Sequence, residues 1–321
     1  MNKIRLAILG ASDIAFRRFL PALKKDDRFF YVGVASRTPE KASAFVSKFG
    51  GTIFSGYDAA SALDDIDAVY LPLPPALHFE WARKALLYDK HVFLEKPSTT
   101  NASNTAELVK LAENKRLALK ENYMFLHHAQ LREINVIVNS GQIGVLRLIR
   151  IAFGFPKRPE SDFRYNKDLG GGALLDCGGY TLRLASEFLG ESAKVTTASL
   201  THEKSYGVDI AGSATLRNEM GLVAQVSFGM DNSYKCELEL WGSKGCIISP
   251  RIFTAPGGFV PTVELQTADG KTVLRMPEDD QFLGSIRHFY DCILDSKTRK
   301  ESYAFLLRQS KLVEDVRLNN E

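Results

Sequence analysis

The first 120 residues alternate between two hydrophobic periods, and this alternation constrains the fold more than any other feature of the chain. Short apolar runs, which are typical of buried strands, span 5–9, 31–35, 68–71 and 91–94. Stretches with apolar residues at helical spacing follow them at 14–23, 39–49, 78–87 and 102–113. Strands that alternate with helices of this length predict an α/β domain, in which helices cover both faces of a parallel sheet.

The pattern changes after about residue 145, where strand-like runs follow one another without intervening helices. They span 146–153, 194–200, 210–217, 221–228, 236–241, 246–248 and 263–267. Turn signals such as Gly242-Ser243 and Asp269-Gly270 join several of them, which predicts a large, mostly antiparallel open sheet. Helices are expected at 281–295 and 302–316. We therefore expect two domains, 1–121 and 122–321, the second of α+β type, with C-terminal helices that are candidates to pack back on the first.

Composition excludes several classes of protein. Lys and Arg total 41 against 38 acidic residues, so the chain lacks the basic excess of a nucleic-acid binder. Its four cysteines contain no Cys-x-x-Cys pair, which excludes the usual zinc spacings and favours a reducing compartment. No apolar stretch approaches the roughly 18 residues of a membrane span, and the first apolar run is too short for a signal peptide. The sequence predicts a cytoplasmic protein without metal, nucleic-acid or membrane partners.

The turn after the first expected strand is a candidate dinucleotide site. Gly10 permits a tight turn, and backbone N–H groups of Ser12, Asp13 and Ile14 at the helix start are expected to hold a pyrophosphate. Serine and alanine replace the second and third glycines of the full motif. A glycine between a strand and a helix is common, so this turn alone leaves cofactor binding open.

The end of the second strand indicates which dinucleotide would bind. It reads Ser36-Arg37-Thr38, whereas an NAD site usually places a carboxylate here for the ribose 2′-hydroxyl. Arg37 suits a 2′-phosphate because its planar fork bonds two oxygens, and Ser36, Thr38 and Lys41 lie near enough to assist. The pattern favours NADP(H). The alternative is a solvated arginine at a strand end.

Two further strands end in residues expected at the cofactor crevice, since open α/β sheets bind ligands at the carboxyl edge. Leu71, Pro72 and Leu73 end one of them, although prolines there also simply terminate a strand. Glu95-Lys96-Pro97 ends the other and is far more specific. A lysine directly after a buried strand points into the crevice rather than into bulk water.

A glycine-rich segment from Gly170 to Tyr180 is the last candidate. It predicts a loop followed by a helix in which Asp176 and Tyr180, at i and i+4, project from one face. Gly178 and Gly179 lie between them and each cost about 1 kcal/mol relative to alanine inside a helix. That cost suggests a close approach to this backbone. The alternative is an aspartate favoured by the helix dipole and a tyrosine buried between domains.

Together these segments resemble the Gfo/Idh/MocA family of oxidoreductases, named after glucose-fructose oxidoreductase, inositol dehydrogenase and rhizopine catabolism. The segments that carry the resemblance are the Gly10 turn, 71–75, Glu95–Pro97, Glu121-Asn122 and 170–180. The resemblance implies an α/β Rossmann domain followed by an α+β domain with a large, mostly antiparallel open sheet. Members commonly form homodimers or homotetramers through that sheet. His78 and Asn122 join the expected cofactor residues on this ground.

The resemblance also implies a reaction, hydride transfer between nicotinamide and a sugar carbonyl or hydroxyl. Many members have histidine at the position of Tyr180. Members with tyrosine include sugar oxidoreductases, dihydrodiol dehydrogenases and 3-ketoreductases of nucleotide-linked deoxysugars. We expect Tyr180 to supply the proton, Lys96 to favour its phenolate, and Asp176 to orient the substrate or Lys96. Gln130 and Arg164 are expected to line the substrate pocket with Asp176 and Tyr180.

The expected reaction is reduction of a keto-sugar, which is either linked to a nucleoside diphosphate, as in the resembling branch, or a free small molecule. The alternative is an NADP-dependent dehydrogenase of an aldose or of a cyclic trans-diol. A more distant alternative is a sensor that binds cofactor and sugar without catalysis. The presence of Lys96, Asp176 and Tyr180 together argues against a sensor, which needs no proton donor.

Overall fold

The computed structural model describes residues 2–320, and the chain divides into two compact units. The first unit is formed by the chain up to Asn122 together with Phe282–Ser310. The second is formed by Tyr123–Gln281 and the residues from Lys311 onward. Each unit is described by itself below.

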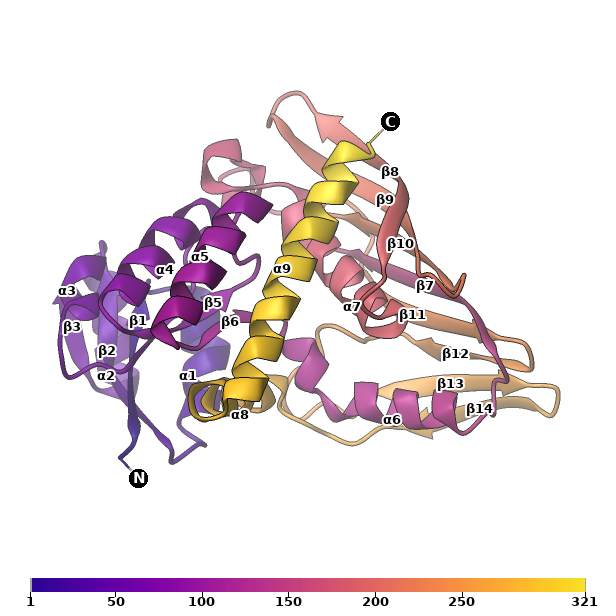
Figure 1. Cartoon of the computed structure of the whole chain (residues 1–321), viewed down its shortest axis with the longest axis horizontal. Helices are drawn as coiled ribbons and strands as arrows, with labels where there is room; N and C mark the ends of the chain where they lie inside the picture. Colours follow the sequence, from indigo (N-terminus) through magenta and orange to yellow (C-terminus); the bar gives the residue numbers. More distant parts are fainter. Residues whose placement is uncertain (1, 321) are drawn as a thin grey trace. The chain divides into compact units, whose positions relative to one another are not determined.

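The first unit contains a parallel sheet of six strands, in the order β3-β2-β1-β4-β5-β6 (Figure 1). The strands are β1 (Ile4–Leu9), β2 (Phe29–Ser36), β3 (Thr52–Ser55), β4 (Ala68–Leu71), β5 (His91–Glu95) and β6 (Leu119–Asn122). This order is that of the dinucleotide-binding Rossmann fold, in which the strand order reverses beside β1. The α/β class predicted from the alternating periods is confirmed.

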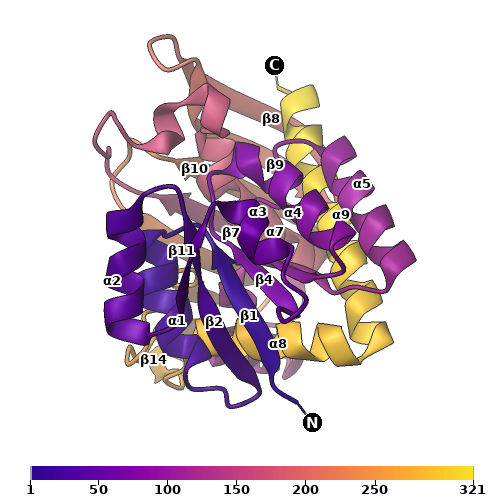
Figure 2. The same cartoon turned by 90° about the vertical axis from the view of Figure 1, so that its left-hand side faces the viewer.

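Helices cover both faces of this sheet, with α1 and α2 on one side and α4 and α5 on the other (Figure 2). The first helix runs from residue 13 and contains a π-helical stretch, Ala15–Phe19, before α1 (Leu20–Leu23). The others are α2 (Pro39–Phe49), α3 (Tyr57–Ser61), α4 (His78–Leu87), α5 (Ala102–Lys115), α8 (Gln281–Leu294) and α9 (Ser296–Leu318). The last helix, α9, contributes residues to both units.

The C-terminal helices supply side chains to the core on each face of the sheet. On one face Phe289 of α8 stacks on Phe93 with ring centroids 4.9 Å apart, and Tyr70 stacks on Phe19 at 3.6 Å. On the other face Tyr303 and Leu306 of α9 join the cluster of buried apolar residues that includes Leu71. Because each large apolar side chain contributes about 1.5–3 kcal/mol when buried, Phe282–Ser310 is an integral part of this unit.

The second unit contains an eight-stranded sheet in the order β14-β13-β12-β11-β7-β10-β9-β8. Its strands are β7 (Leu146–Gly154), β8 (Lys194–Glu203), β9 (Val208–Arg217), β10 (Val223–Gly229), β11 (Lys235–Gly242), β12 (Gly245–Ser249), β13 (Thr262–Thr267) and β14 (Gly270–Arg275). Only the β7–β10 pair of these strands is parallel. The chain crosses over through α7 (Gly179–Leu189), so that β8 runs in the same direction as β7. It reverses at β9 and again at β10, which makes β10 parallel to β7. The mostly antiparallel sheet predicted from the sequence is confirmed.

Among the described α-helices and strands, five have no counterpart in the sequence prediction: β3, α3, β6, α6 (Ala129–Asn139) and β14. In β3 only Phe54 is buried, and β14 is largely exposed. Neither strand has the alternation of buried and exposed residues from which a strand is recognised.

Within residues 2–320, no helix is both long and apolar enough to cross a membrane. In the same part of the chain, no group of three or more His, Cys, Asp or Glu side chains is placed to hold a metal ion.

Candidate active site

The turn after β1 has the backbone of a phosphate-binding turn. Gly10 has φ +120°, and a Cβ at this position would lie 2.6 Å from Leu73 Cδ2. Its N–H donates to the Ala35 carbonyl of β2 (2.9 Å). The Ser12 hydroxyl accepts from the Ala15 N–H (3.3 Å), so the serine that replaces the second glycine caps the helix. The N–H groups of this first turn have no intrahelical acceptors and are suited to an anion.

Arg37 lies exposed at the carboxyl end of β2, next to this turn in the sheet. The Ser36 hydroxyl accepts from the Thr38 N–H and donates to the Thr38 carbonyl, both at 3.0 Å. Ser36 therefore closes a small turn that presents Arg37, while its own hydroxyl is engaged there. Lys41 is exposed in the first turn of α2.

Glu95 anchors the segment that carries Lys96. Its Oε1 accepts from the Tyr70 hydroxyl (2.6 Å) and from Asn122 Nδ2 (2.7 Å). Burial raises the pKa of the Glu95 carboxyl, while the hydrogen bonds from Tyr70 and Asn122 and the charge of Lys96 act in the opposite direction. The side chain that precedes Lys96 is thus tied to the neighbouring strands β4 and β6.

The residues after Lys96 are held as well. The Lys96–Pro97 peptide bond is cis, and the Ser98 N–H donates to Glu121 Oε1 (2.6 Å). His78 is fully buried, with Nδ1 2.7 Å from the Pro97 carbonyl oxygen and Nε2 2.7 Å from that of Leu73. Burial and the nearby Lys96 lower the pKa of His78. The imidazole joins the backbones of two segments that border the carboxyl edge of the sheet.

Tyr180 belongs to the second unit and lies in a cluster of aromatic rings. It is 6% exposed, and its hydroxyl is 3.6 Å from Met124 Sδ. The rings around it, with centroids 5.2–5.8 Å away, are those of Tyr123, Phe125, Phe153 and Phe253. Such edge-to-face and tilted contacts fix the orientation of the ring.

The helix that carries Asp176 and Tyr180 is π-helical over Leu174–Gly178 before it continues as α7. A Cβ at Gly178 would lie 3.1 Å from the Leu174 side chain and from the Phe228 ring. For Gly178, the close approach inferred from the glycines is therefore explained by Leu174 and by Phe228 of β10. Single π-helical turns are often found at functional sites.

Asp176 forms an ion pair with Arg164. Arg164 Nε donates to Asp176 Oδ2 (2.6 Å), and Nη1 donates to Asp162 Oδ1 (3.1 Å). Burial lowers the pKa of Arg164, but the two carboxylates outweigh this effect and the pKa is raised. The guanidinium remains charged and orients the Asp176 carboxylate.

Close contacts account for two of the three glycines before this helix, Gly171 and Gly172. Gly172 has φ +115°, and a Cβ there would overlap Asp209 Oδ1. A Cβ at Gly171 would overlap the Arg164 carbonyl oxygen. Asp209 Oδ2 accepts from the Leu174 N–H at the start of the helix (2.6 Å), and burial raises the pKa of this carboxyl. Asp209 was missed in the sequence because it lies on β9, far along the chain.

Gln130 is fully buried in the second unit. Its Nε2 lies 3.3 Å from the carbonyl oxygens of Arg251 and Ile252, to which it donates. The contacts of Gln130 in the structure are thus with the protein itself, and its expected role toward a substrate stays a prediction.

The expected site residues therefore form one group in each unit. Those for a dinucleotide border the carboxyl edge of the Rossmann sheet: Gly10, Ser12, Asp13, Ile14, Ser36, Arg37, Thr38, Lys41, Leu71, Pro72, Leu73, His78, Glu95, Lys96 and Asn122. In the second unit the structure joins Asp176 to Arg164, and Tyr180 lies one turn further along the same helix.

A Rossmann sheet with a glycine turn at its carboxyl edge places the first unit in the class of dinucleotide-binding domains. Residues 4–123 match the oxidoreductase family with an NAD-binding Rossmann fold, and residues 131–248 match the GFO/IDH/MocA C-terminal domain. The chain belongs to the Gfo/Idh/MocA family, as the motifs in its sequence predicted.

The chain is similar to sugar reductases along nearly its whole length. It is 40% identical over 316 residues to the dTDP-3,4-didehydro-2,6-dideoxy-alpha-D-glucose 3-reductase of Actinomadura kijaniata, covering 98% of this chain and 95% of that protein. A crystal structure of a 3-ketoreductase from the same organism, in complex with NADP and TDP-benzene, superposes with a TM-score of 0.96 at 40% identity. That match covers 100% of this chain and 98% of the other. Two further structures of that enzyme carry a tyrosine-to-phenylalanine and a lysine-to-alanine replacement, at positions 84 residues apart.

A sugar dehydrogenase is also similar, over a smaller part of the chain. The D-xylose 1-dehydrogenase (NADP(+)) 2 of Haloferax volcanii is 33% identical over 227 residues, which cover 70% of this chain and 69% of that protein.

Proposed function

We propose that this protein is an NADPH-dependent reductase of a keto sugar linked to a nucleoside diphosphate, with the 3-keto group as the reacting carbonyl. The proposal rests on the spacing between a lysine and a tyrosine, which this chain shares with a relative that matches it along nearly its whole length. Lys96 and Tyr180 are 84 residues apart (180 − 96), as are the lysine and tyrosine replaced in the 3-ketoreductase of A. kijaniata. Asp176 stands four residues before Tyr180, paired with Arg164.

The residues of the first unit fit NADP(H). Gly10 leaves the turn without a Cβ, the helix start offers N–H groups, and Arg37 is presented at the end of β2. We assign the pyrophosphate to the Gly10–Ile14 turn and the 2′-phosphate to Arg37, with Thr38 and Lys41 beside it. When bound, the nicotinamide supplies the hydride for carbonyl reduction.

The chain's own residues then supply and guide the proton. Reduction places negative charge on the carbonyl oxygen, and we assign Tyr180 as the acid that donates a proton to it. The ammonium of Lys96 favours the tyrosinate left behind. Asp176, oriented by Arg164, binds a sugar hydroxyl, since an ionised carboxylate accepts strong hydrogen bonds.

The substrate test compares the nucleotide-linked sugar with the free sugar. With NADPH and a dTDP-linked 3-keto-deoxysugar, we expect a kcat/KM at least ~100-fold above that for the same sugar without the nucleotide. Oxidation of NADPH is followed by its absorbance. Faster oxidation of a free aldose or a trans-diol with NADP+ would instead support the dehydrogenase alternative, which the similarity to the xylose dehydrogenase favours.

Arg37→Ala tests the cofactor assignment. We expect the Kd for NADPH to rise about 10- to 100-fold, because a charge-assisted bond to the 2′-phosphate is lost, while the Kd for NADH stays within about twofold. Titration followed by nicotinamide fluorescence measures both. Arg132→Ala, which removes an exposed arginine from the second unit, is the matched control. An equal loss of affinity for both cofactors would refute the role of Arg37.

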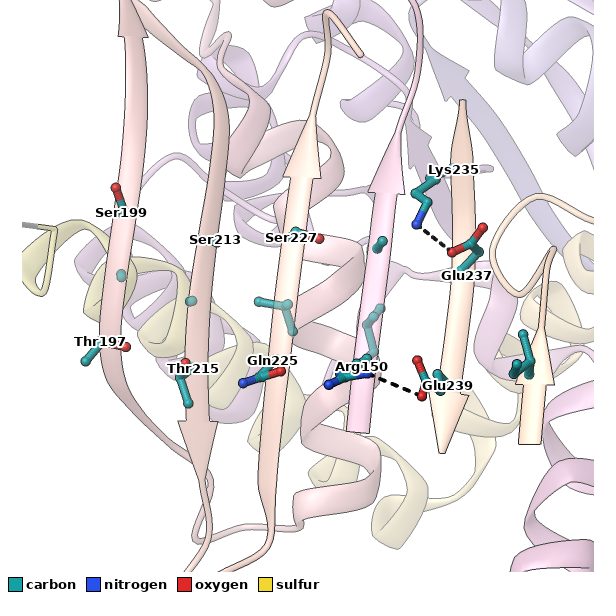
Figure 3. Close-up of a pocket in the computed structure, with 16 residues that line it drawn as sticks. Arg150, Thr197, Ser199, Ser213, Thr215, Gln225, Ser227, Lys235, Glu237 and Glu239 are labelled. Atoms are coloured by element: carbon teal, nitrogen blue, oxygen red, sulfur yellow. Dashed lines mark ion pairs between the residues drawn. The ribbon is translucent and has the colours of Figure 1, made fainter. Parts of the chain in front are cut away.

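We also propose that the protein is a cytoplasmic homodimer or homotetramer that associates through the open face of the eight-stranded sheet. Residues of adjacent strands line a hollow of about 670 Å³ on this face (Figure 3). They are mostly polar, and include the ion pairs Arg150–Glu239 and Lys235–Glu237. Sedimentation equilibrium is expected to give a multiple of the 35.7 kDa chain mass, and a monomer at micromolar concentration would contradict the proposal.

A further inference from the structure

A chain of hydrogen bonds runs through the first unit from a buried lysine to the Glu95 carboxylate. Lys120 Nζ donates to Ser285 Oγ (2.9 Å), and Ser285 Oγ donates to Asn122 Oδ1 (2.7 Å). Asn122 Nδ2 donates to Glu95 Oε1 (2.7 Å), which also accepts from the Tyr70 hydroxyl (2.6 Å). Lys120 is 4% exposed, and Asn122, Ser285 and Tyr70 are fully buried. We call these five side chains the Lys120–Glu95 relay.

The relay joins parts of the chain that are far apart in the sequence. Lys120 and Asn122 are alternate residues of β6 and therefore project to one face of the sheet. Ser285 comes from α8, which packs on the sheet through the stacked rings of Phe289 and Phe93. The Lys120 ammonium also lies 5.0 Å from the centroid of the Phe93 ring.

The ammonium fixes the direction of each bond on the path from Lys120 through Ser285 and Asn122 to Glu95. An ammonium only donates, so the Ser285 oxygen accepts from Lys120 and its own hydrogen turns to Asn122 Oδ1. The Asn122 amide must then present its NH₂ group to Glu95. That end requires an acceptor, which an ionised carboxylate provides. A cation at one end and an anion at the other thus select one orientation of both neutral side chains.

Because the charges of Lys120 and Glu95 are buried, the hydrogen bonds that they form have a large effect on the free energy of this arrangement. A buried ammonium or carboxylate is costly unless it is hydrogen-bonded and compensated by an opposite charge. In the low dielectric of the interior, a fully satisfied network specifies one arrangement strongly, and a partly satisfied one is destabilising. Burial raises the pKa of Glu95, and its hydrogen bond from Asn122 counters that effect.

We propose that Lys120 and Ser285 are positioning residues for the reaction. Through Asn122 they keep Glu95 ionised and in one orientation, and Glu95 in turn fixes the backbone from which Lys96 projects. The inference rests on the proposed function in one respect, the assignment of Lys96 as a catalytic residue. The relay itself is testable without a substrate.

Ser285→Ala breaks the relay without removing a charge. We expect kcat to fall about tenfold while the KM for NADPH changes less than threefold, because Lys96 is misplaced but the phosphate contacts are kept. Ser285→Thr, which retains the hydroxyl, is expected to restore most of kcat. If both variants lose thermal stability equally and keep the wild-type kcat, Ser285 is merely structural and the proposal is overturned.

Hydrogen exchange of the cofactor-free protein provides the second readout. In Ser285→Ala we expect the amides of Lys96 and Ser98 to exchange about tenfold faster, while those of β2 stay unchanged. Lys120→Met, which fills the same space without the charge, should give the same local change and serves if Ser285→Ala does not fold. Unchanged exchange in both variants would overturn the relay. Faster exchange in a protein that reduces no keto sugar would leave the relay in place and refute the proposed function.

Discussion

Tyr180→Phe is expected to lower the turnover of the keto sugar by a factor of about 100 or more, since the proton donor is lost while the ring is kept. The Kd for NADPH is expected to stay within about twofold, because the dinucleotide residues belong to the first unit. Phenylalanine fits the aromatic cluster around Tyr180, whose hydroxyl is within 3.6 Å of Met124 Sδ. Single-turnover reduction under saturating NADPH measures the chemical step directly.

Tyr123→Phe is the matched control for this prediction. It removes the same hydroxyl group from a buried ring whose centroid is 5.3 Å from that of Tyr180. Turnover in this variant is expected to stay within about threefold of the wild-type rate. If Tyr180→Phe also keeps a rate in that range, Tyr180 is not the acid.

Lys96→Met is expected to have the second large effect, a fall in kcat of about 10²- to 10⁴-fold. Methionine retains most of the side-chain volume and removes the ammonium, so the tyrosinate formed by proton donation loses the charge that favours it. The pH dependence of kcat is informative, because the variant should require more alkaline conditions for the reverse reaction, in which Tyr180 acts as the base. Steady-state assays in both directions measure this.

Two further variants test whether any cation at position 96 is sufficient and whether removal of a lysine elsewhere has an effect. Lys96→Arg keeps a cation with different geometry and is expected to recover only part of the rate. Lys110→Met changes an exposed lysine on α5 and is expected to have no effect. Wild-type turnover in Lys96→Met would remove the lysine from the mechanism.

Much of the first unit could be predicted because its elements are long and periodic. The helices expected at 39–49 and 78–87 have those bounds in the structure, as does the strand at 68–71. Buried strands and amphipathic helices leave a clear hydrophobic period, and that period depends only on local spacing. β14, which is largely exposed, leaves no such period and was not predicted.

The candidate site, too, has features that the local sequence indicates and features that it does not. Gly10, Lys96, Asp176 and Tyr180 lie in short motifs whose residue types already indicate their chemistry. Their supporting contacts have no local signal. Asp209 reaches the helix start at Leu174 from another strand, and nothing in the sequence around either residue indicates that contact.

By itself, the sequence determined the α/β and α+β classes, the family and the candidate catalytic residues, because these depend on periods and motifs within short stretches. Only the tertiary structure decided that Arg164 holds Asp176, and that Ser285 connects Lys120 to Asn122 from 163 residues further along the chain. The physical reason is that hydrogen bonds and ion pairs depend on distances in space. Those distances are set when distant segments pack together to bury apolar surface, and spacing in the sequence does not record them.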